Sequence, residues 1–124
     1  MSTNKALGTH FIIDLHNCAE NLNNIEFIES TFTDIAKKSG ATIVKSCFHQ
    51  FSPHGVTGLL AITESHFAIH TWPEHNFVTV DIFSCSNSID YQKCILLLEK
   101  AFGTTDTRTQ EFERGKLNND IKTF

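Results

Sequence analysis

The chain has 124 residues, of which 40% are apolar and eleven are Phe, and its formal net charge is −4 at pH 7. A chain of this length predicts a single domain, 1–124, that buries roughly two-thirds of its extended surface. A nucleic-acid-binding domain usually carries a basic face, and a membrane-spanning helix needs about 20 consecutive apolar residues. The sequence has neither feature, so we expect no nucleic acid and no membrane among its partners.

The cysteines predict a reducing environment. The four of them, Cys18, Cys47, Cys85 and Cys94, form no CxxC motif, and no signal peptide is recognisable before them. The apolar content is sufficient for a core without a disulfide framework. We therefore expect reduced thiols and a cytoplasmic location, with Cys18, Cys47 and Cys94 in structural roles.

Runs of β-branched and aromatic residues predict a sheet. The predicted strands lie at residues 9–15, 42–51, 58–63, 77–85 and 107–114. The second and third are joined through Ser52-Pro53-His54-Gly55, which is a turn-forming sequence. The last one alternates with little apolar content, so we expect it at an edge of the sheet.

Two segments have the apolar spacing of helices. In the first, apolar residues recur from Ile25 to Ala36, with Asn23 or Asn24 as the N-cap and Gly40, just beyond Ser39, as the stop. The second follows Ser88 and has Gly103 at its end. Two helices among five or six strands, mostly joined by short turns, predict an α+β fold. We expect a two-layer sandwich in which a mostly antiparallel sheet carries both helices on one face.

The strand at 77–85 indicates what covers the other face. Val78, Val80 and Ile82 point to one face and are all apolar, as expected beneath helices. Its odd-numbered residues mix aromatic and polar side chains: Phe77, Thr79, Asp81, Phe83 and Cys85. Two helices cannot cover both faces, so we expect the mixed face to meet a second protomer, a ligand or both.

The segment TESHFAIHTWPEHN, residues 63–76, carries most of the reactive side chains. It contains Glu64-Ser65-His66, followed by His70 and by Trp72-Pro73-Glu74, and Cys85 lies downstream. Taken alone, these residues have ordinary interpretations. The serine would lie in a loop between strands, the Glu74 carboxylate in solvent, and the cysteine in the core.

The surrounding sequence resembles the prokaryotic S-adenosylmethionine decarboxylases. The likeness runs nearly throughout GVTGLLAITESHFAIHTWPEHNFVTVDIFSC at 55–85, with ATIVKSCFHQF before it at 41–51. LGTH at 7–10 and ERG at 113–115 are also similar to the family. The resemblance implies a cytoplasmic lyase of spermidine biosynthesis, made as a zymogen, whose uncovered sheet face packs on a second protomer.

The resemblance also implies self-cleavage. Ser65 matches the serine that becomes a pyruvoyl group, Glu64 the new carboxyl terminus, and His70 a residue that assists processing. Chemically, the serine hydroxyl can attack the preceding carbonyl to give an ester, and β-elimination then leads to the pyruvoyl group. The attack passes through an oxyanion, so we expect nearby donors and a strained backbone. Thr57 stands where the family commonly has a serine, and its restricted rotamers predict slower processing.

Further residues match substrate and catalytic positions of the family. Cys85 matches the catalytic acid, Phe51 an aromatic that contacts the substrate, and Glu74 the carboxylate that holds the ribose hydroxyls. A pyruvoyl carbonyl forms a Schiff base with the substrate amine and accepts the electrons left when CO₂ departs. A free cysteine thiol has a pKa of about 8.5, so such a group can then return a proton to carbon. The implied minimal assembly contains two copies each of chains 1–64 and 65–124.

Two other functions fit part of the pattern. A pyruvoyl-dependent ornithine or arginine decarboxylase would keep Ser65, His70 and Cys85 but would not need Phe51 or Glu74. A dimeric α+β binding module that is never cleaved would need none of these groups for chemistry.

A metal site is the remaining alternative. His66, His70 and His75, with Cys85 downstream, are possible ligands, and the first two have the spacing of ligands on one helix face. The segment is rich in β-branched and aromatic residues and does not have the pattern of a helix. We therefore expect no metal.

Overall fold

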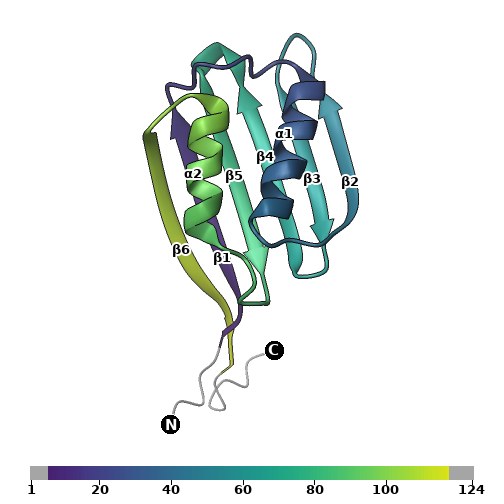
Figure 1. Ribbon diagram of the computed structural model, residues 1–124, viewed down its shortest axis with the longest axis vertical. Coiled ribbons are helices and arrows are strands. Elements are labelled where there is room, and N and C mark those ends of the chain that lie inside the picture. Colours follow the sequence, from purple (N-terminus) through teal and green to yellow (C-terminus); the bar gives the residue numbers. More distant parts are fainter. Residues whose placement is uncertain (1–5, 118–124) are drawn as a thin grey trace.

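The structure, a computed structural model, describes residues 6–117 and contains a six-stranded sheet with two α-helices. The elements are β1 (Ala6–His16), α1 (Ile25–Lys38), β2 (Ile43–Gln50), β3 (Val56–Ile62), β4 (Ser65–Trp72), the 3₁₀ turn η1 (Pro73–His75), β5 (Phe77–Ser84), α2 (Tyr91–Phe102) and β6 (Asp106–Lys116). All neighbouring strands are antiparallel, and both helices lie on one face of the sheet (Figure 1). The predicted α+β two-layer fold is confirmed.

The order of strands in the sheet is β2-β3-β4-β5-β1-β6. The first four strands in this order follow the chain through short turns. The N-terminal strand β1 instead lies between β5 and β6, which come from the second half of the chain. The two halves of the sequence are therefore interleaved within one sheet (Figure 1).

One apolar core lies between the helices and the sheet. Its largest fully buried side chains are Phe32, Phe67, Phe102, Ile13, Leu15, Ile28, Leu60, Ile69, Ile82, Leu98, Val56 and Val78. The two layers meet, for example, where Phe32 of α1 contacts Phe67 of β4 with ring centroids 5.9 Å apart. Each such side chain contributes about 1.5–3 kcal/mol on burial, so the core is large enough to hold the sheet in one register.

Helix α1 begins and ends as the sequence predicts. The Asn24 side chain accepts a hydrogen bond from the Phe27 backbone N–H at 3.1 Å, which selects Asn24 over Asn23 as the N-cap. After the helix, Gly40 has a φ of 107°, and a side chain there would collide with the backbone of Ser88. This glycine lets the end of α1 approach the loop that leads into α2. No helix within the described residues is long and apolar enough to cross a membrane.

The observed strands differ from the predicted ones in two places. The segment from Ser65 to Trp72 forms the central strand β4, although the sequence pattern assigned no separate strand to it. Strand β1 and the edge strand β6 are also longer than expected, because they pair with each other from Ala6 opposite Lys116 to His16 opposite Asp106.

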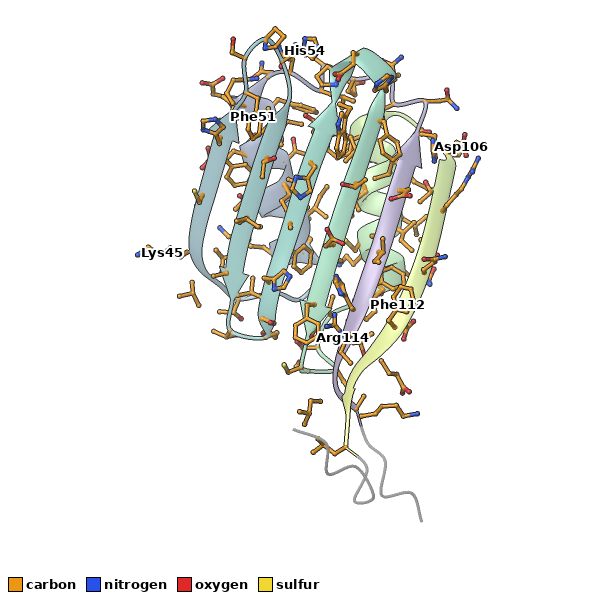
Figure 2. All side chains as sticks on the ribbon, turned by 180° about the vertical axis from the view of Figure 1, so that it is seen from behind. Lys45, Phe51, His54, Asp106, Phe112 and Arg114 are labelled. Atoms are coloured by element: carbon orange, nitrogen blue, oxygen red, sulfur yellow. The ribbon has the colours of Figure 1, made fainter. Side chains whose placement is uncertain are left out.

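The uncovered face of the sheet is mixed in character, as the pattern of β5 predicts. Val78, Val80 and Ile82 are fully buried beneath the helices, and the residues between them are half-buried on the opposite side. Large apolar side chains that remain well exposed on this face include Phe51 at 48%, Leu59 at 49%, Trp72 at 37% and Phe112 at 45%. This face, seen in Figure 2, carries the side chains discussed next.

Candidate active site

The Glu64–Ser65 bond lies in the tight hairpin between β3 and β4. Ile62 pairs with Ser65, so only Thr63 and Glu64 form the turn. The Thr63 N–H donates to the Thr42 carbonyl at 2.9 Å, and the Thr42 N–H donates to the Glu64 carboxylate at 3.1 Å. The second of these bonds is the main reason why the pKa of Glu64 is lowered. The turn is thereby fixed to the residues that precede β2.

The backbone at this bond is strained and its carbonyl is polarised. Ser65 has a φ of 155°, a conformation that residues with side chains rarely adopt. Such a conformation costs about 1–3 kcal/mol and persists only where the surroundings impose it. On the other side of the bond, the Glu64 carbonyl oxygen accepts a hydrogen bond from the backbone N–H of Cys85 at 2.9 Å. Both features expected for an attack by the serine hydroxyl are therefore present.

The thiol of Cys85 is exposed and lies immediately after β5, beside the hairpin. Its backbone is held by a local turn in which the Ser84 hydroxyl accepts from the Ser86 N–H at 3.1 Å and donates to the Ser86 carbonyl at 2.9 Å. Two other cysteines are less suited to donate a proton, because burial raises the pKa of the Cys18 and Cys94 thiols to about 11.

A second group of polar side chains lies at the opposite end of β4. Thr57 of β3 is paired with His70 of β4, and the Thr57 hydroxyl lies 3.0 Å from the His70 Nδ1. If the hydroxyl donates this bond, the histidine proton is on Nε2 and Nδ1 is the acceptor. A cavity of about 300 Å³ opens here, lined by Phe51, His54, Gly55, Thr57, His70, Thr71, Trp72 and Glu74.

The cavity combines aromatic walls with one carboxylate. Phe51 packs edge-on against the His49 ring, with centroids 4.6 Å apart. The Trp72 ring lies 6.1 Å from that of His70. The Glu74 carboxylate pairs with His54 Nε2 at 3.2 Å. Such walls suit a flat aromatic group, and the carboxylate suits hydroxyl groups or a positive charge.

The structure therefore divides the predicted site residues into two groups. One contains Glu64, Ser65 and Cys85, and the other contains Phe51, Thr57, His70 and Glu74. His70 lies five residues beyond Ser65 on the same strand, a distance of about 16 Å at the usual rise per residue. Figure 2 shows Phe51 and His54 at one end of the sheet and Arg114, near the Ser65 end, at the other. One chain does not bring the two groups together.

Some residues of these surroundings were not predicted from the sequence. On the uncovered face, His10 Nε2 lies 3.5 Å from the Asp81 carboxylate, and Arg114 lies 3.2 Å from His10 Nδ1. Next to them, burial lowers the pKa of His66, and the nearby His10 lowers it further. The alternation of β1 and β5 was the available signal for this set. No spacing rule in the sequence brings His54 to the cavity.

Comparison with known proteins covers both groups of residues. The family model described as S-adenosylmethionine decarboxylase matches residues 9–115. The chain belongs to this family. The S-adenosylmethionine decarboxylase proenzyme of Thermotoga maritima is 42% identical over 113 residues, which cover 90% of this chain and 87% of the relative. That of Acidithiobacillus ferrooxidans is 36% identical over 115 residues, which cover 92% and 86%.

A solved structure agrees with the assignment. The crystal structure of the adenosylmethionine decarboxylase from Aquifex aeolicus VF5 is 29% identical to this decarboxylase, with a TM-score of 0.81. The match covers 96% of this chain and 99% of that one. The chain is thus an enzyme of the S-adenosylmethionine decarboxylase type. Within residues 6–117 of this decarboxylase, no three His, Cys, Asp or Glu side chains are grouped so that they could hold a metal ion.

Proposed function

We propose that the protein is a pyruvoyl-dependent S-adenosylmethionine decarboxylase that cleaves itself between Glu64 and Ser65 into chains 1–64 and 65–124. The observation that carries this proposal is the strained Ser65, with a φ of 155°, next to a carbonyl that accepts the Cys85 backbone N–H at 2.9 Å. Strain in the bond to be broken and a donor on its oxygen are what an intramolecular acyl shift requires.

The cleavage follows from these contacts. The Ser65 hydroxyl attacks the Glu64 carbonyl carbon, and the Cys85 N–H stabilises the oxyanion that forms. The C–N bond then breaks to leave an ester and a free amine on Ser65. Loss of the serine α-proton expels the Glu64 carboxylate from the β-carbon, and hydrolysis of the resulting enamine releases ammonia and leaves the pyruvoyl group.

The mature enzyme uses the same end of the sheet for catalysis. When formed, the pyruvoyl group supplies an electron sink for the loss of CO₂ from the bound substrate. The Cys85 thiol is exposed beside the hairpin, so it is available to donate a proton to the substrate carbon. The other exposed cysteine, Cys47, lies on the edge strand β2 and has no part in this step.

The complete site needs a second copy of the chain. His70 lies about 16 Å along the strand from Ser65, too far to assist its cleavage within one protomer. If the uncovered faces of two copies pack with their strands in opposite directions, the Ser65 group of one meets the His70 group of its partner. The exposed Phe51, Leu59, Trp72 and Phe112 supply the apolar contact that such an interface requires. We therefore propose at least a homodimer of cleaved protomers.

The cavity supports S-adenosylmethionine as the substrate. Its Phe51 ring can stack on adenine, and the Glu74 carboxylate can accept hydrogen bonds from both ribose hydroxyls. The substrate amine and carboxylate would then reach toward the partner's Ser65 end. The product, decarboxylated S-adenosylmethionine, would serve as the aminopropyl donor for spermidine synthesis. The four free cysteines fit a reducing cytoplasm.

A single preparation tests the proposal. Intact mass spectrometry should show two chains, 1–64 and 65–124. Chain 65–124 should resist Edman sequencing until the pyruvoyl group at its N-terminus is reductively aminated. The cleaved protein should release CO₂ from carboxyl-labelled S-adenosylmethionine and not from labelled ornithine or arginine. An intact chain after long incubation at neutral pH would exclude self-cleavage, and preference for either amino acid would overturn the substrate assignment.

A further inference from the structure

His54 lies in the turn between β2 and β3, and this turn is firmly held. The backbone N–H of the next residue, Gly55, donates to the Asn23 side chain at 2.8 Å, and the Gly55 carbonyl accepts from the Phe51 N–H at 2.8 Å. The Gln50 side chain donates to both the Asn23 side chain and the Gly55 carbonyl. The backbone that carries the imidazole is therefore fixed from both sides.

Glu74 has much less support of its own. It lies on η1, a single turn of three residues whose first position has no side-chain cap. Within residues 6–117, His54 is the one side chain that pairs with its carboxylate, with 3.2 Å between Nε2 and Oε1. The side chains of His54 and Glu74 are 39% and 40% exposed, and both line the cavity.

We propose that His54 is a positioning residue that holds the Glu74 carboxylate toward the substrate hydroxyls and thereby sets substrate affinity. This inference rests on the proposed function, which assigns Glu74 to the ribose. An ion pair as exposed as this one contributes little to folding stability. It does restrict the rotamers of Glu74, and binding then costs less side-chain entropy.

The pairing leaves the carboxylate free to bind. A carboxylate offers about four lone-pair positions, so the contact of His54 with Oε1 leaves acceptor positions on both oxygens for two hydroxyls. The imidazole can donate from Nε2 whether it is neutral or protonated. A glutamine at position 54 also carries a side-chain N–H₂ donor, whereas alanine has none, which supplies a conservative variant for a test.

The first test is kinetic. His54→Ala, His54→Gln and the wild type are compared with S-adenosylmethionine as substrate, after intact mass has shown complete cleavage of each. His75→Ala is the matched control, because His75 is exposed on the same turn and does not line the cavity. We expect His54→Ala to raise KM about 3- to 10-fold with little change in kcat, since the contact that restrains the Glu74 carboxylate is lost. His54→Gln should recover most of the affinity, and His75→Ala should match the wild type.

The second test asks whether His54 acts through Glu74. His54→Ala should have no further effect on KM in a Glu74→Gln background, because the group to be positioned has already lost its charge. A wild-type KM for His54→Ala, independent effects of the two changes, or loss of self-cleavage in His54→Ala would each overturn this inference while leaving the proposed function intact. Failure of the fully cleaved wild type to decarboxylate S-adenosylmethionine would overturn the proposed function, and this inference with it.

Discussion

Ser65 occupies a backbone conformation that only glycine adopts without cost. Ser65 has a φ of 155° and is paired with Ile62 on one side and with Ser84 on the other. A serine at this position is therefore less stable than its contacts alone would suggest. In the proposed reaction the strain is released when the peptide bond breaks, which lowers the barrier to cleavage.

Two substitutions at Ser65 distinguish the role of its hydroxyl from the effect of backbone strain at this position. Ser65→Ala and Ser65→Gly both remove the hydroxyl, so both chains should stay uncut. Ser65→Gly should nevertheless unfold with a free energy about 1 kcal/mol higher than Ser65→Ala in urea titrations, because glycine accepts this φ. Glycine ordinarily destabilises a strand relative to alanine. If Ser65→Gly were less stable than Ser65→Ala, the proposal that the backbone is strained at Ser65 would be wrong.

The two roles proposed for Cys85 belong to different atoms. Its backbone N–H contacts the Glu64 carbonyl, and its thiol is exposed for proton donation. Cys85→Ala keeps the N–H, so it should cleave itself, but its turnover should fall by roughly 10² to 10⁴ for a lost general acid. Gel electrophoresis reports the first result and CO₂ release the second. Cys47→Ala, which changes an exposed thiol on β2, should behave as the wild type in both assays.

At the scale of the elements, the sequence predicted both helices, the antiparallel sheet and the covered face, but not β4. In that strand the buried Phe67, Ile69 and Thr71 alternate with His66 and His70. From the sequence, His70 is interpreted as a processing residue and both histidines are possible metal ligands, but no strand is assigned to them. In addition, the closeness of the reactive residues in the sequence of this motif does not correspond to closeness in space. Its reactive residues are close in sequence, but an extended strand separates Ser65 from His70 by about 16 Å. Contacts such as that of His54 with Glu74 depend on two turns meeting, which local patterns do not specify.

The strand order predicts that the cleaved chains stay together. Chain 1–64 would contribute β1, which lies between β5 and β6 of chain 65–124, and β3 would remain paired with β4. Both chains should therefore elute as one species in size-exclusion chromatography without denaturant and separate in about 6 M guanidinium chloride, which unfolds all but hyperstable domains. Elution of free chain 65–124 under native conditions would contradict this expectation.

At the scale of the whole molecule, the proposed site is shared between two copies, so function depends on the arrangement of one sheet face against another. The uncovered face then serves both as interface and as active site. This explains its mixture of exposed aromatic and titratable side chains. It also means that processing and turnover should both require dimerisation, because neither copy alone combines Ser65 with His70.

Mixed dimers give the sharpest test of this arrangement. Ser65→Ala lacks the nucleophile, so alone it should remain uncut. His70→Ala lacks the group proposed to assist cleavage, so alone it should remain uncut or stall at an ester that hydroxylamine traps. When the two are co-expressed with different tags, the Ser65 of the His70→Ala copy faces an intact His70 from its partner. About half of the His70→Ala chains should then be cleaved if dimers form at random from equal amounts. Mass spectrometry of the tagged chains measures the fraction. If no His70→Ala chain is cut, the site is not shared in this way, whatever the oligomeric state.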